Sequence, residues 1–408
     1  MPKHPSFSDY YNQYLDPESY EKLLQTLEVP TNKSLRVNTS LYTNKEFLQF
    51  AKKNNIQISP VSWSKIGFYY KLPENLKSLG ALPENEQGLY YLQDSASMIP
   101  SEILEPKKDE LILDMCSAPG GKTIHISNLV RNNVNIIANE VEKKRSTLLC
   151  LQLKKYGLSN VIVTTYDSSF FAKNMTNKFD KILIDAPCSG EGMRERGLSI
   201  IKNFNYSLIK FNAKRQQRIL TNAFQALKKG GTLVYSTCAL SYDENEGVVD
   251  YLLKKFPQNA KLKITKITEF PGISKENSNF NKCIRIWPFY LNTNGFFVAK
   301  IVKTEDSPIK IEKEKFNSHQ KPSKSENWKN LDAKNSLIIQ KKITKIIGKE
   351  FKIPENLKIA QFKNEYWLQP KFLDKLNLPY VKYAGLLIGR MNENRLNLEI
   401  SEELIKRI

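Results

Sequence analysis

Two cysteines in this sequence stand where their thiols could do chemistry. Cys188 follows an aliphatic segment in ILIDAPCSG, and Cys238 follows another in TLVYSTC. A deprotonated thiol is a strong nucleophile, whereas a cysteine on an apolar strand is more commonly a small core residue. Asp185, three residues before Cys188, adds a carboxyl group that could handle a proton. These residues predict either nucleophilic catalysis or core packing, and their place in the fold decides between the two.

The elements that would position these residues lie between about 109 and 302. Short aliphatic segments alternate there with amphipathic ones, from ELILDMC and TIHISNLVRN to TLVYSTC and GFFVAKIV. This alternation is typical of a doubly wound, mostly parallel sheet. The last segments flank the turn-rich LNTNG and predict one antiparallel strand at the sheet edge. Ligands bind such a sheet at the carboxyl ends of its strands, so Cys188, Cys238 and Asp185 should face one cleft.

A glycine-rich turn, in LILDMCSAPGGKT, leads from the first aliphatic segment into a helix that begins near Lys122. One interpretation is a phosphate-binding loop, because Gly121, Lys122 and Thr123 match the end of the G-x-x-x-x-G-K-[ST] pattern. Cys116 occupies the position of that pattern's first glycine, which argues against the match. In such an ATPase, Asp185 would bind Mg²⁺.

The second interpretation of the same turn is an adenosine site. The second aliphatic segment, in IIANE, ends at Glu140, and the third, VIVTTYD, ends at Asp167. An acidic residue after the second strand can hold ribose hydroxyls, and Asp167 would approach the adenine. Acidic residues also occur in loops for turn geometry alone. Three successive strands that each end in a polar residue nevertheless favour the adenosine site.

Five stretches resemble one known family, the RNA cytosine-5 methyltransferases of the Nop2/Sun (NSUN/RsmF) group, in particular the bacterial RsmF-like enzymes. They are LDMCSAPGGKT, ANE, IDAPCSGEGMRER, LKKGGTLVYSTCALSYDENE and RIWPFYLNTNGFFVAKI. The resemblance spans about residues 86–303. It implies a Rossmann-like, class I S-adenosylmethionine-dependent methyltransferase core of the EC 2.1.1 class, with small N- and C-terminal α+β domains that bind RNA.

The resemblance also implies roles for individual residues. Cys238 would attack C6 of cytosine, and Cys188 would assist release of the enzyme after methylation. Asp185 would hold the N3/N4 edge of the base, and Lys122 would favour the thiolate. The residues implied for S-adenosylmethionine binding are Cys116, Ser117, Ala118, Pro119, Gly120, Gly121, Lys122, Glu140, Asp167 and Asp185.

Four segments are expected along the chain. Residues 1–85 would form an N-terminal α+β RNA-binding module, and 86–303 would form the methyltransferase core. Residues 304–335 are charged and poor in apolar residues, which predicts a linker. Hydrophobicity resumes in 336–408, which would form a C-terminal RNA-binding domain.

The charge balance favours a polyanionic partner. Lys and Arg outnumber Asp and Glu by 62 to 42, and neutralisation of phosphates drives association with nucleic acids. Arg36, Arg194 and Arg196 are candidate phosphate contacts. The resemblance implies small-subunit ribosomal RNA as the substrate, with transfer RNA as an alternative. A non-catalytic ribosome assembly factor with the same fold remains a second alternative.

Several further expectations follow from what the sequence contains. The five cysteines form no C-x-x-C pair and do not cluster with the three histidines, so no metal site is predicted. No apolar run approaches the roughly 18 residues that a membrane span requires. The N-terminal residues resemble neither a secretory signal nor a transit peptide. A cytoplasmic, monomeric enzyme is therefore expected.

Overall fold

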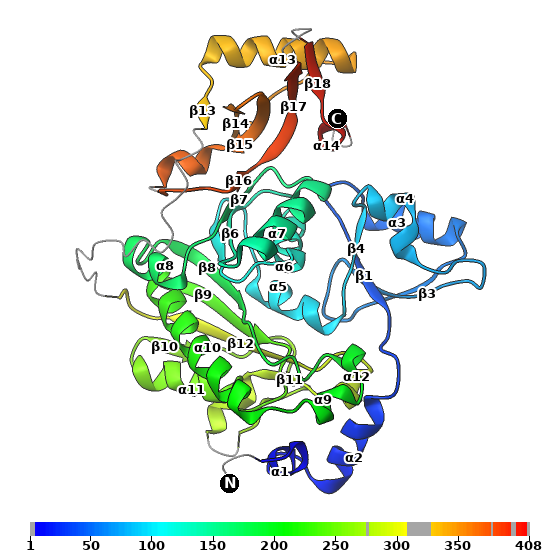
Figure 1. Ribbon diagram of the computed structural model, residues 1–408, viewed down its shortest axis with the longest axis vertical. Coiled ribbons are helices and arrows are strands. Elements are labelled where there is room, and N and C mark those ends of the chain that lie inside the picture. The colour runs from blue at the N-terminus through cyan, green and yellow to red at the C-terminus, as the bar shows by residue number, and fades with distance from the viewer. Residues whose placement is uncertain (1–4, 275–276, 308–327, 377, 393–396, 406–408) are drawn as a thin grey trace.

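Three β-sheets organise the chain in the computed structural model, which describes residues 5–274, 277–307, 328–376, 378–392 and 397–405 (Figure 1). A four-stranded N-terminal sheet and a five-stranded C-terminal sheet flank a central sheet of nine strands. Most of the predicted linker, residues 308–327, lies outside the described residues. Within the described ranges, the helices are too short or too polar to cross a membrane.

The central sheet is built on five parallel strands. Their order, β9-β8-β5-β6-β7, is set by parallel register between each neighbouring pair. The parallel strands are β5 (Leu111–Asp114), β6 (Asn135–Asn139), β7 (Val161–Thr164), β8 (Phe179–Asp185) and β9 (Leu227–Thr237). The predicted Rossmann-like, mostly parallel sheet is confirmed.

Antiparallel strands extend this sheet on both sides. They are β10 (Ala260–Leu262), β11 (Ile284–Ile286), β12 (Phe296–Lys303) and β16 (Tyr383–Ala384). Strand β12 pairs with β9, while β10 and β11 both pair with β12. Strand β16, from the C-terminal part of the chain, pairs with β7 at the opposite edge. The prediction of a single antiparallel edge strand is therefore incomplete.

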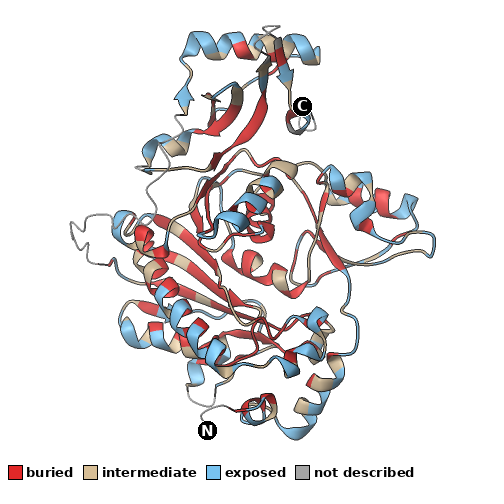
Figure 2. Cartoon of the chain, viewed as in Figure 1, coloured by how far each residue is buried: buried red, intermediate tan, exposed pale blue. Residues whose placement is uncertain are grey.

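Helices cover both faces of the central sheet, and the strands between them are almost wholly buried (Figure 2). One face carries α5 (Ile99–Leu104), α6 (Gly121–Leu129) and α7 (Lys143–Lys155). The other carries α8 (Ser168–Asn174), α10 (Tyr206–Ala226) and α11 (Glu246–Lys255). The sequence of α10 explains why this helix packs on the sheet. Its buried residues recur at three- or four-residue spacing, which places them on one face of the helix: Ile209, Ala213, Gln216, Leu220 and Phe224.

The N-terminal residues form two separate parts. Helices α1 (Phe7–Tyr11) and α2 (Pro17–Thr26) pack against the core, near the short helices α9 (Ser199–Lys202) and α12 (Pro288–Leu291) (Figure 1). The four-stranded sheet follows, with α3 (Asn44–Lys53) and α4 (Pro83–Glu86) beside it. Its strands, in the order β2-β3-β1-β4, are β2 (Gln57–Pro60), β3 (Gly67–Lys71), β1 (Ser34–Val37) and β4 (Tyr90–Leu92).

The C-terminal part is an antiparallel sheet with its own apolar core. Its strands are β13 (Lys329–Asn330), β14 (Leu357–Phe362), β15 (Glu365–Pro370), β17 (Leu386–Asn392) and β18 (Asn397–Ile400). Helices α13 (Ala333–Ile347) and α14 (Glu402–Ile405) complete it. Strand β16 lies between β15 and β17 in the sequence, but it pairs with β7 of the central sheet. The C-terminal part therefore contributes a strand to the central sheet.

Candidate active site

The two cysteines meet at the carboxyl edge of the central sheet. Asp185 is the last residue of β8 and pairs in register with Ser236 of β9, while Cys238 follows the last residue of β9. Because β8 and β9 are parallel neighbours, the loops that leave them emerge side by side. The Sγ atoms of Cys188 and Cys238 lie 3.4 Å apart. The structure therefore brings together the two thiols that the sequence singles out.

Asp185 is held from two sides. Lys122 Nζ, from the first turn of α6, donates to Asp185 Oδ2 at 2.6 Å. Ser236 Oγ, from β9, donates to Asp185 Oδ1 at 3.0 Å. The ammonium also lies 5.2 Å above the ring of Phe296 on β12. A carboxylate with an ammonium donor on one oxygen and a hydroxyl donor on the other is held in a fixed direction.

The environment of Cys188 keeps its thiol protonated. The hydrogen bond with Cys238 raises the pKa of Cys188 well above its ordinary value, and burial raises it further. The carboxylates of Glu244 and Asp185 act in the same direction. A thiol that keeps its proton can donate a hydrogen bond to a neighbouring sulfur, which stabilises negative charge there.

A cavity of ≈ 670 Å³, including space open to solvent, reaches Pro187, the residue that precedes Cys188. Three of the residues predicted for the cofactor, Cys116, Glu140 and Asp167, line it. Its other lining residues are Met115, Asn139, Val141, Arg145, Tyr166, Ser168, Pro187, Arg215, Arg218 and Ile219. Burial raises the pKa of Cys116 far above its usual range, so this third cysteine lines the cavity as a neutral group.

Glu140 fits a ligand that carries hydroxyl groups. Its side chain is buried, and Oε1 accepts a hydrogen bond from the backbone N–H of Glu142 at 3.0 Å. Its Oε2 accepts no hydrogen bond from the described part of the chain, and Arg145 Nη1 lies 3.3 Å away. A buried carboxylate oxygen that lacks a donor is costly, and the hydroxyls of a ribose would supply one.

The other predicted cofactor residues form the turn that supports the cavity. Ser117, Ala118, Pro119, Gly120 and Gly121 connect β5 to α6. Gly120 has φ of 117°, a left-handed conformation that glycine adopts without strain. An added Cβ at this position would also lie 3.1 Å from Leu149 on α7. Among the turn residues predicted for the cofactor, Cys116 is the one that lines the cavity.

Sequence reasoning missed the cationic side chains of this cavity. Arg145, on α7, donates to the Ala118 carbonyl at 2.8 Å and pairs with Glu140. Arg218, on α10, pairs with Asp167 at 3.2 Å. Arg215 lies one turn earlier on α10. The proximity of Arg145 to IIANE in the sequence was a usable signal, whereas nothing in the pattern of α10 shows that its arginines face this cavity.

Two arginines predicted to contact RNA phosphates are buried instead. Arg36 on β1 is 0% exposed and donates to Gln93, Asn128 and the carbonyl of Gly121. Arg194 is 4% exposed and binds the carbonyls of Thr26 and Val29. These two predictions are wrong, because each guanidinium satisfies its donors within the protein. Arg196 is exposed and remains a candidate.

In the described residues, no group of three or more His, Cys, Asp or Glu side chains could hold a metal ion. What the fold does supply is a Rossmann-like sheet, a cavity lined by the buried carboxylate of Glu140 and a pair of thiols at the carboxyl edge of the sheet. A protein with this arrangement belongs to the class of S-adenosylmethionine-dependent methyltransferases.

Comparisons with known proteins identify the family. Residues 101–302 match the model described as 16S rRNA methyltransferase RsmB/F, and residues 4–95 match the N-terminal domain of 16S rRNA methyltransferase RsmF. "Ribosomal RNA small subunit methyltransferase F" of Shewanella piezotolerans is 32% identical over 92% of this chain and 76% of its own length. The protein of the same name from Vibrio cholerae is 31% identical, over 95% of this chain and 78% of its own.

Solved structures agree. NSun6 from Pyrococcus horikoshii with SFG superposes with a TM-score of 0.66 at 27% identity, and covers 75% of this chain and 99% of its own. A methyltransferase homologue from the same organism gives 0.64 at 34% identity, over 72% of this chain and 93% of its own. The chain therefore belongs to the RsmF family, and it is a methyltransferase that uses S-adenosylmethionine.

Proposed function

We propose that this protein methylates C5 of a cytosine in small-subunit ribosomal RNA through a covalent adduct between Cys238 and C6 of the base. The observation that carries the proposal is the pair of thiols 3.4 Å apart at the carboxyl edge of the sheet, beside Asp185 and the cavity. The names of the relatives support ribosomal RNA as the substrate. Transfer RNA is the alternative.

S-Adenosylmethionine, when bound, supplies an electrophilic methyl group. Cys116, Glu140 and Asp167 would hold it in the cavity they line, with Glu140 on the ribose hydroxyls. Cations from α7 and α10 balance these acidic groups: Arg145 pairs with Glu140 and Arg218 with Asp167.

Cys238 would begin the reaction. C5 of cytosine is a poor nucleophile, but addition of the Cys238 thiolate at C6 forms a C–S bond and converts the ring into an enamine whose C5 can take the methyl group. Asp185 would accept a hydrogen bond from N4–H or from N3–H of a cytosine that carries a proton on N3, so its carboxylate stabilises the cationic ring, and addition of the thiolate to that ring gives a neutral enamine. Lys122 supports this carboxylate through its 2.6 Å ion pair.

Cys188 would take part in release. After methyl transfer, the C5 proton leaves to a base, the C6–S bond breaks and the electron pair returns to Cys238. The Sγ of Cys188 lies 3.4 Å from the Sγ of Cys238, next to the C–S bond that must break. The assignment of Cys238 as the attacking group and Cys188 as the group that assists elimination follows the resemblance to the RNA cytosine-5 methyltransferases.

A base inside a duplex cannot present C6 to a thiolate, so the cytosine must lie in a loop or be flipped out. The test is methyl transfer from labelled S-adenosylmethionine to small-subunit ribosomal RNA and to transfer RNA that both lack the modification, followed by bisulfite mapping. We expect incorporation at a cytosine of the ribosomal RNA.

Denaturing electrophoresis of the same reactions distinguishes the roles of the two thiols. Cys188→Ala should accumulate a covalent RNA–protein adduct that survives denaturing electrophoresis, because attack proceeds and release stalls. Cys238→Ala should give no adduct and no product. Adduct with Cys238→Ala alone would reverse the two roles, and binding of RNA without methyl transfer by the wild type would favour an assembly factor. Methylation of transfer RNA alone would replace the substrate.

A further inference from the structure

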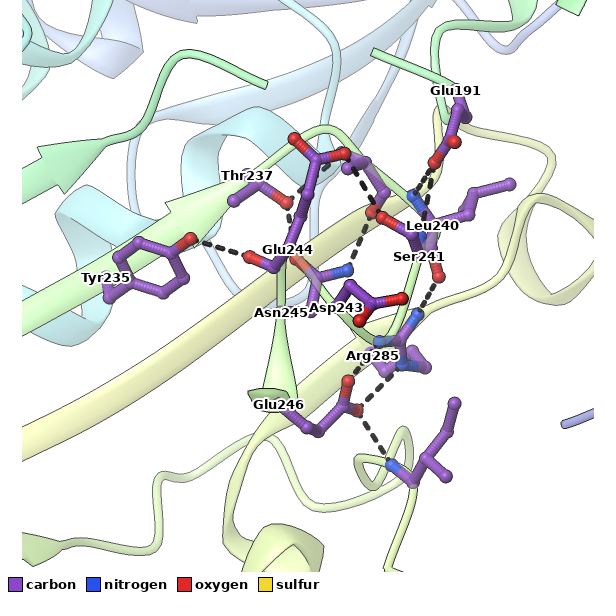
Figure 3. Close-up of polar contacts among 12 residues, drawn as sticks. Glu191, Tyr235, Thr237, Leu240, Ser241, Asp243, Glu244, Asn245, Glu246 and Arg285 are labelled. Atoms are coloured by element: carbon purple, nitrogen blue, oxygen red, sulfur yellow. Dashed lines mark hydrogen bonds and ion pairs between the residues drawn. The ribbon is translucent and has the colours of Figure 1, made fainter. Parts of the chain in front are cut away.

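The loop that follows Cys238 contains more buried carboxylates than the proposed reaction uses. Glu244 lies in this loop, Glu246 begins α11 directly after it, and both are 0% exposed. Glu191 lies in the loop that follows Cys188 and is 6% exposed. Figure 3 shows these side chains gathered around residues 239–246. Buried carboxylates are retained only where they are well bound, so their partners indicate what they hold.

Glu244 reaches from the Cys238 loop to the Cys188 loop. Its Oε1 accepts the backbone N–H of Ser189, the residue after Cys188, at 3.0 Å. The hydroxyl of Ser189 also donates to Oε2, and Gln216 of α10 donates to Oε1 at 2.9 Å. Ser241, from the same loop as Glu244, donates to Oε2 at 3.1 Å. The carboxylate of Glu244 therefore holds the backbone of the Cys188 loop at Ser189.

Glu191 makes the reciprocal connection. Its Oε2 accepts the backbone N–H groups of Leu240 and Ser241, which lie two and three residues after Cys238, at 3.3 and 3.2 Å. Tyr11 of α1 donates to the same oxygen at 2.9 Å. Figure 3 shows the contacts of Glu191 with Leu240 and Ser241. Each cysteine loop thus sends a buried carboxylate to backbone amides of the other loop.

The backbones of the two loops are also in direct contact. The N–H of Gly192 donates to the Cys238 carbonyl at 2.8 Å, and the N–H of Gly295 donates to the Gly192 carbonyl at 2.8 Å. A Cβ on Gly192 would lie 2.7 Å from the Cys238 oxygen and 2.5 Å from the Gly295 oxygen. The two loops are therefore so close at Gly192 that no larger residue would fit there. The hydrogen bonds of Glu191 and Glu244 join the same two loops.

Glu246 is a third buried carboxylate near the Cys238 loop, but its contacts differ from those of Glu191 and Glu244. It forms a buried ion pair with Arg285, which in turn donates to the Leu240 carbonyl at 2.6 Å (Figure 3). Glu246 also accepts the N–H of Ile273 at 2.8 Å. These contacts tie the Cys238 loop to β11 and its flank, whereas the contacts of Glu191 and Glu244 join the two thiol loops to each other.

We propose that Glu191 and Glu244 are positioning residues that set the separation of the Cys188 and Cys238 thiols. The inference rests on the proposed function for its importance, since a reaction that passes between two thiols needs them at a fixed distance. Catalytic groups must stay within about 0.5 Å of their productive geometry. The cross-loop hydrogen bonds from these two carboxylates to Ser189, Leu240 and Ser241 supply that constraint.

The separation can be measured without RNA. Phenylarsine oxide, a trivalent arsenical, takes two neighbouring thiols, forms two As–S bonds and releases one water, so its retention depends on the thiol–thiol distance. The full-length protein should bind one equivalent tightly. Cys188→Ser and Cys238→Ser should each abolish this binding, which assigns it to the pair. Retention is then compared among variants by competition with a free dithiol.

Glu244→Ala and Glu191→Ala should each weaken arsenical retention about tenfold or more, because the loops gain freedom to separate. Glu244→Gln and Glu191→Gln should stay within about threefold of wild type, because the amide oxygen still accepts the backbone N–H groups. Glu102→Ala is the matched control. Glu102 is a largely buried carboxylate that binds Ser64 and His125, so this variant should lose thermal stability and keep arsenical retention.

Unchanged retention in Glu244→Ala and Glu191→Ala, with melting temperatures lowered as in Glu102→Ala, would overturn the inference. If one alanine variant fails to fold, the other carries the test with its glutamine partner. Should wild type methylate no RNA while retention still depends on both carboxylates, the proposed function fails and the positioning role stands.

Discussion

Burial controls the protonation of the residues around the thiol pair. It contributes to the raised pKa of Cys188, and it raises the pKa of Glu191 to about 7, with the nearby Glu244 adding to the shift. Glu191 nevertheless accepts three hydrogen bonds with one oxygen. In the described part of the chain its Oε1 has no hydrogen-bond partner, which makes that oxygen the natural place for the proton.

The raised pKa of Glu191 predicts a pH-dependent contribution to stability. An acid whose pKa is raised from 4.5 to about 7 on folding stabilises the protein fully below pH 4.5 and loses that contribution as the pH rises through 7. A shift of this size corresponds to about 3 kcal/mol. Glu191→Gln removes the titration, so the variant should gain on wild type by several degrees in melting temperature between pH 5 and pH 8.

The measurement is thermal unfolding of both proteins across that range at constant ionic strength. Other groups that titrate in the window, such as Asp114, whose pKa burial raises to about 7, are present in both proteins and cancel in the difference. Parallel curves for wild type and Glu191→Gln would show that Glu191 titrates alike in the folded and unfolded states.

Among the helices and strands, the sequence best predicted the position of the residues that directly follow parallel strands. The parallel strands β8 and β9 end in Asp185 and near Cys238, and any parallel pairing brings such ends to one edge. The contacts of α1 with these loops were not predictable, because Tyr11 and Glu191 are 180 residues apart and no local pattern joins them. The arginines of α10 were missed because their direction depends on how that helix packs.

Arg36 shows the limit of reading charge alone. The sign of a side chain does not say whether solvent, RNA or a carbonyl satisfies it, and here strand β1 directs Arg36 into the interface with α6. Its guanidinium also lies 4.6 Å from the ring centre of Tyr91 on β4. Arg36 thus joins the N-terminal sheet to the first turn of the helix that carries Lys122.

Replacement of Arg36 should therefore affect stability, whereas replacement of Arg196 should affect RNA binding. Arg36→Ala removes the donors to buried acceptors on Gln93, Asn128 and Gly121, which should cost about 3 kcal/mol and lower the melting temperature by several degrees. Arg196 is exposed and donates to the Ser189 carbonyl at 2.8 Å, so Arg196→Ala should lower the melting temperature by no more than about a degree while it weakens RNA binding.

The measurements are thermal unfolding and RNA binding at one fixed salt concentration. A stable Arg36→Ala protein with reduced RNA affinity would restore the original prediction for that residue. Equal RNA affinity for Arg196→Ala and wild type would remove Arg196 from the candidate RNA contacts.

Across the whole molecule, the C-terminal part is tied to the cofactor cavity. Strand β16 extends the central sheet beside β7, and Lys382 Nζ donates to Ser146 and Thr147 on α7 at 2.7 and 2.9 Å. Tyr166, which lines the cavity, donates its hydroxyl to the Tyr380 carbonyl at 2.7 Å and accepts the Tyr380 N–H at 2.7 Å. The part of the chain predicted to bind RNA is therefore also bonded to the side of the core that carries this cavity.

Tyr166→Phe tests this connection with the loss of one oxygen. Both hydrogen bonds to the Tyr380 backbone disappear while the ring keeps its stacking with Phe170, so the cost should be about 1 kcal/mol and cofactor affinity should fall about fivefold. Amide exchange should accelerate in residues 380–384. The control is Tyr366→Phe on β15, which makes the same change within the C-terminal sheet and should leave both readouts as in wild type. Unchanged exchange at 380–384 in Tyr166→Phe would mean that the two hydrogen bonds to Tyr380 do not hold this segment on the core.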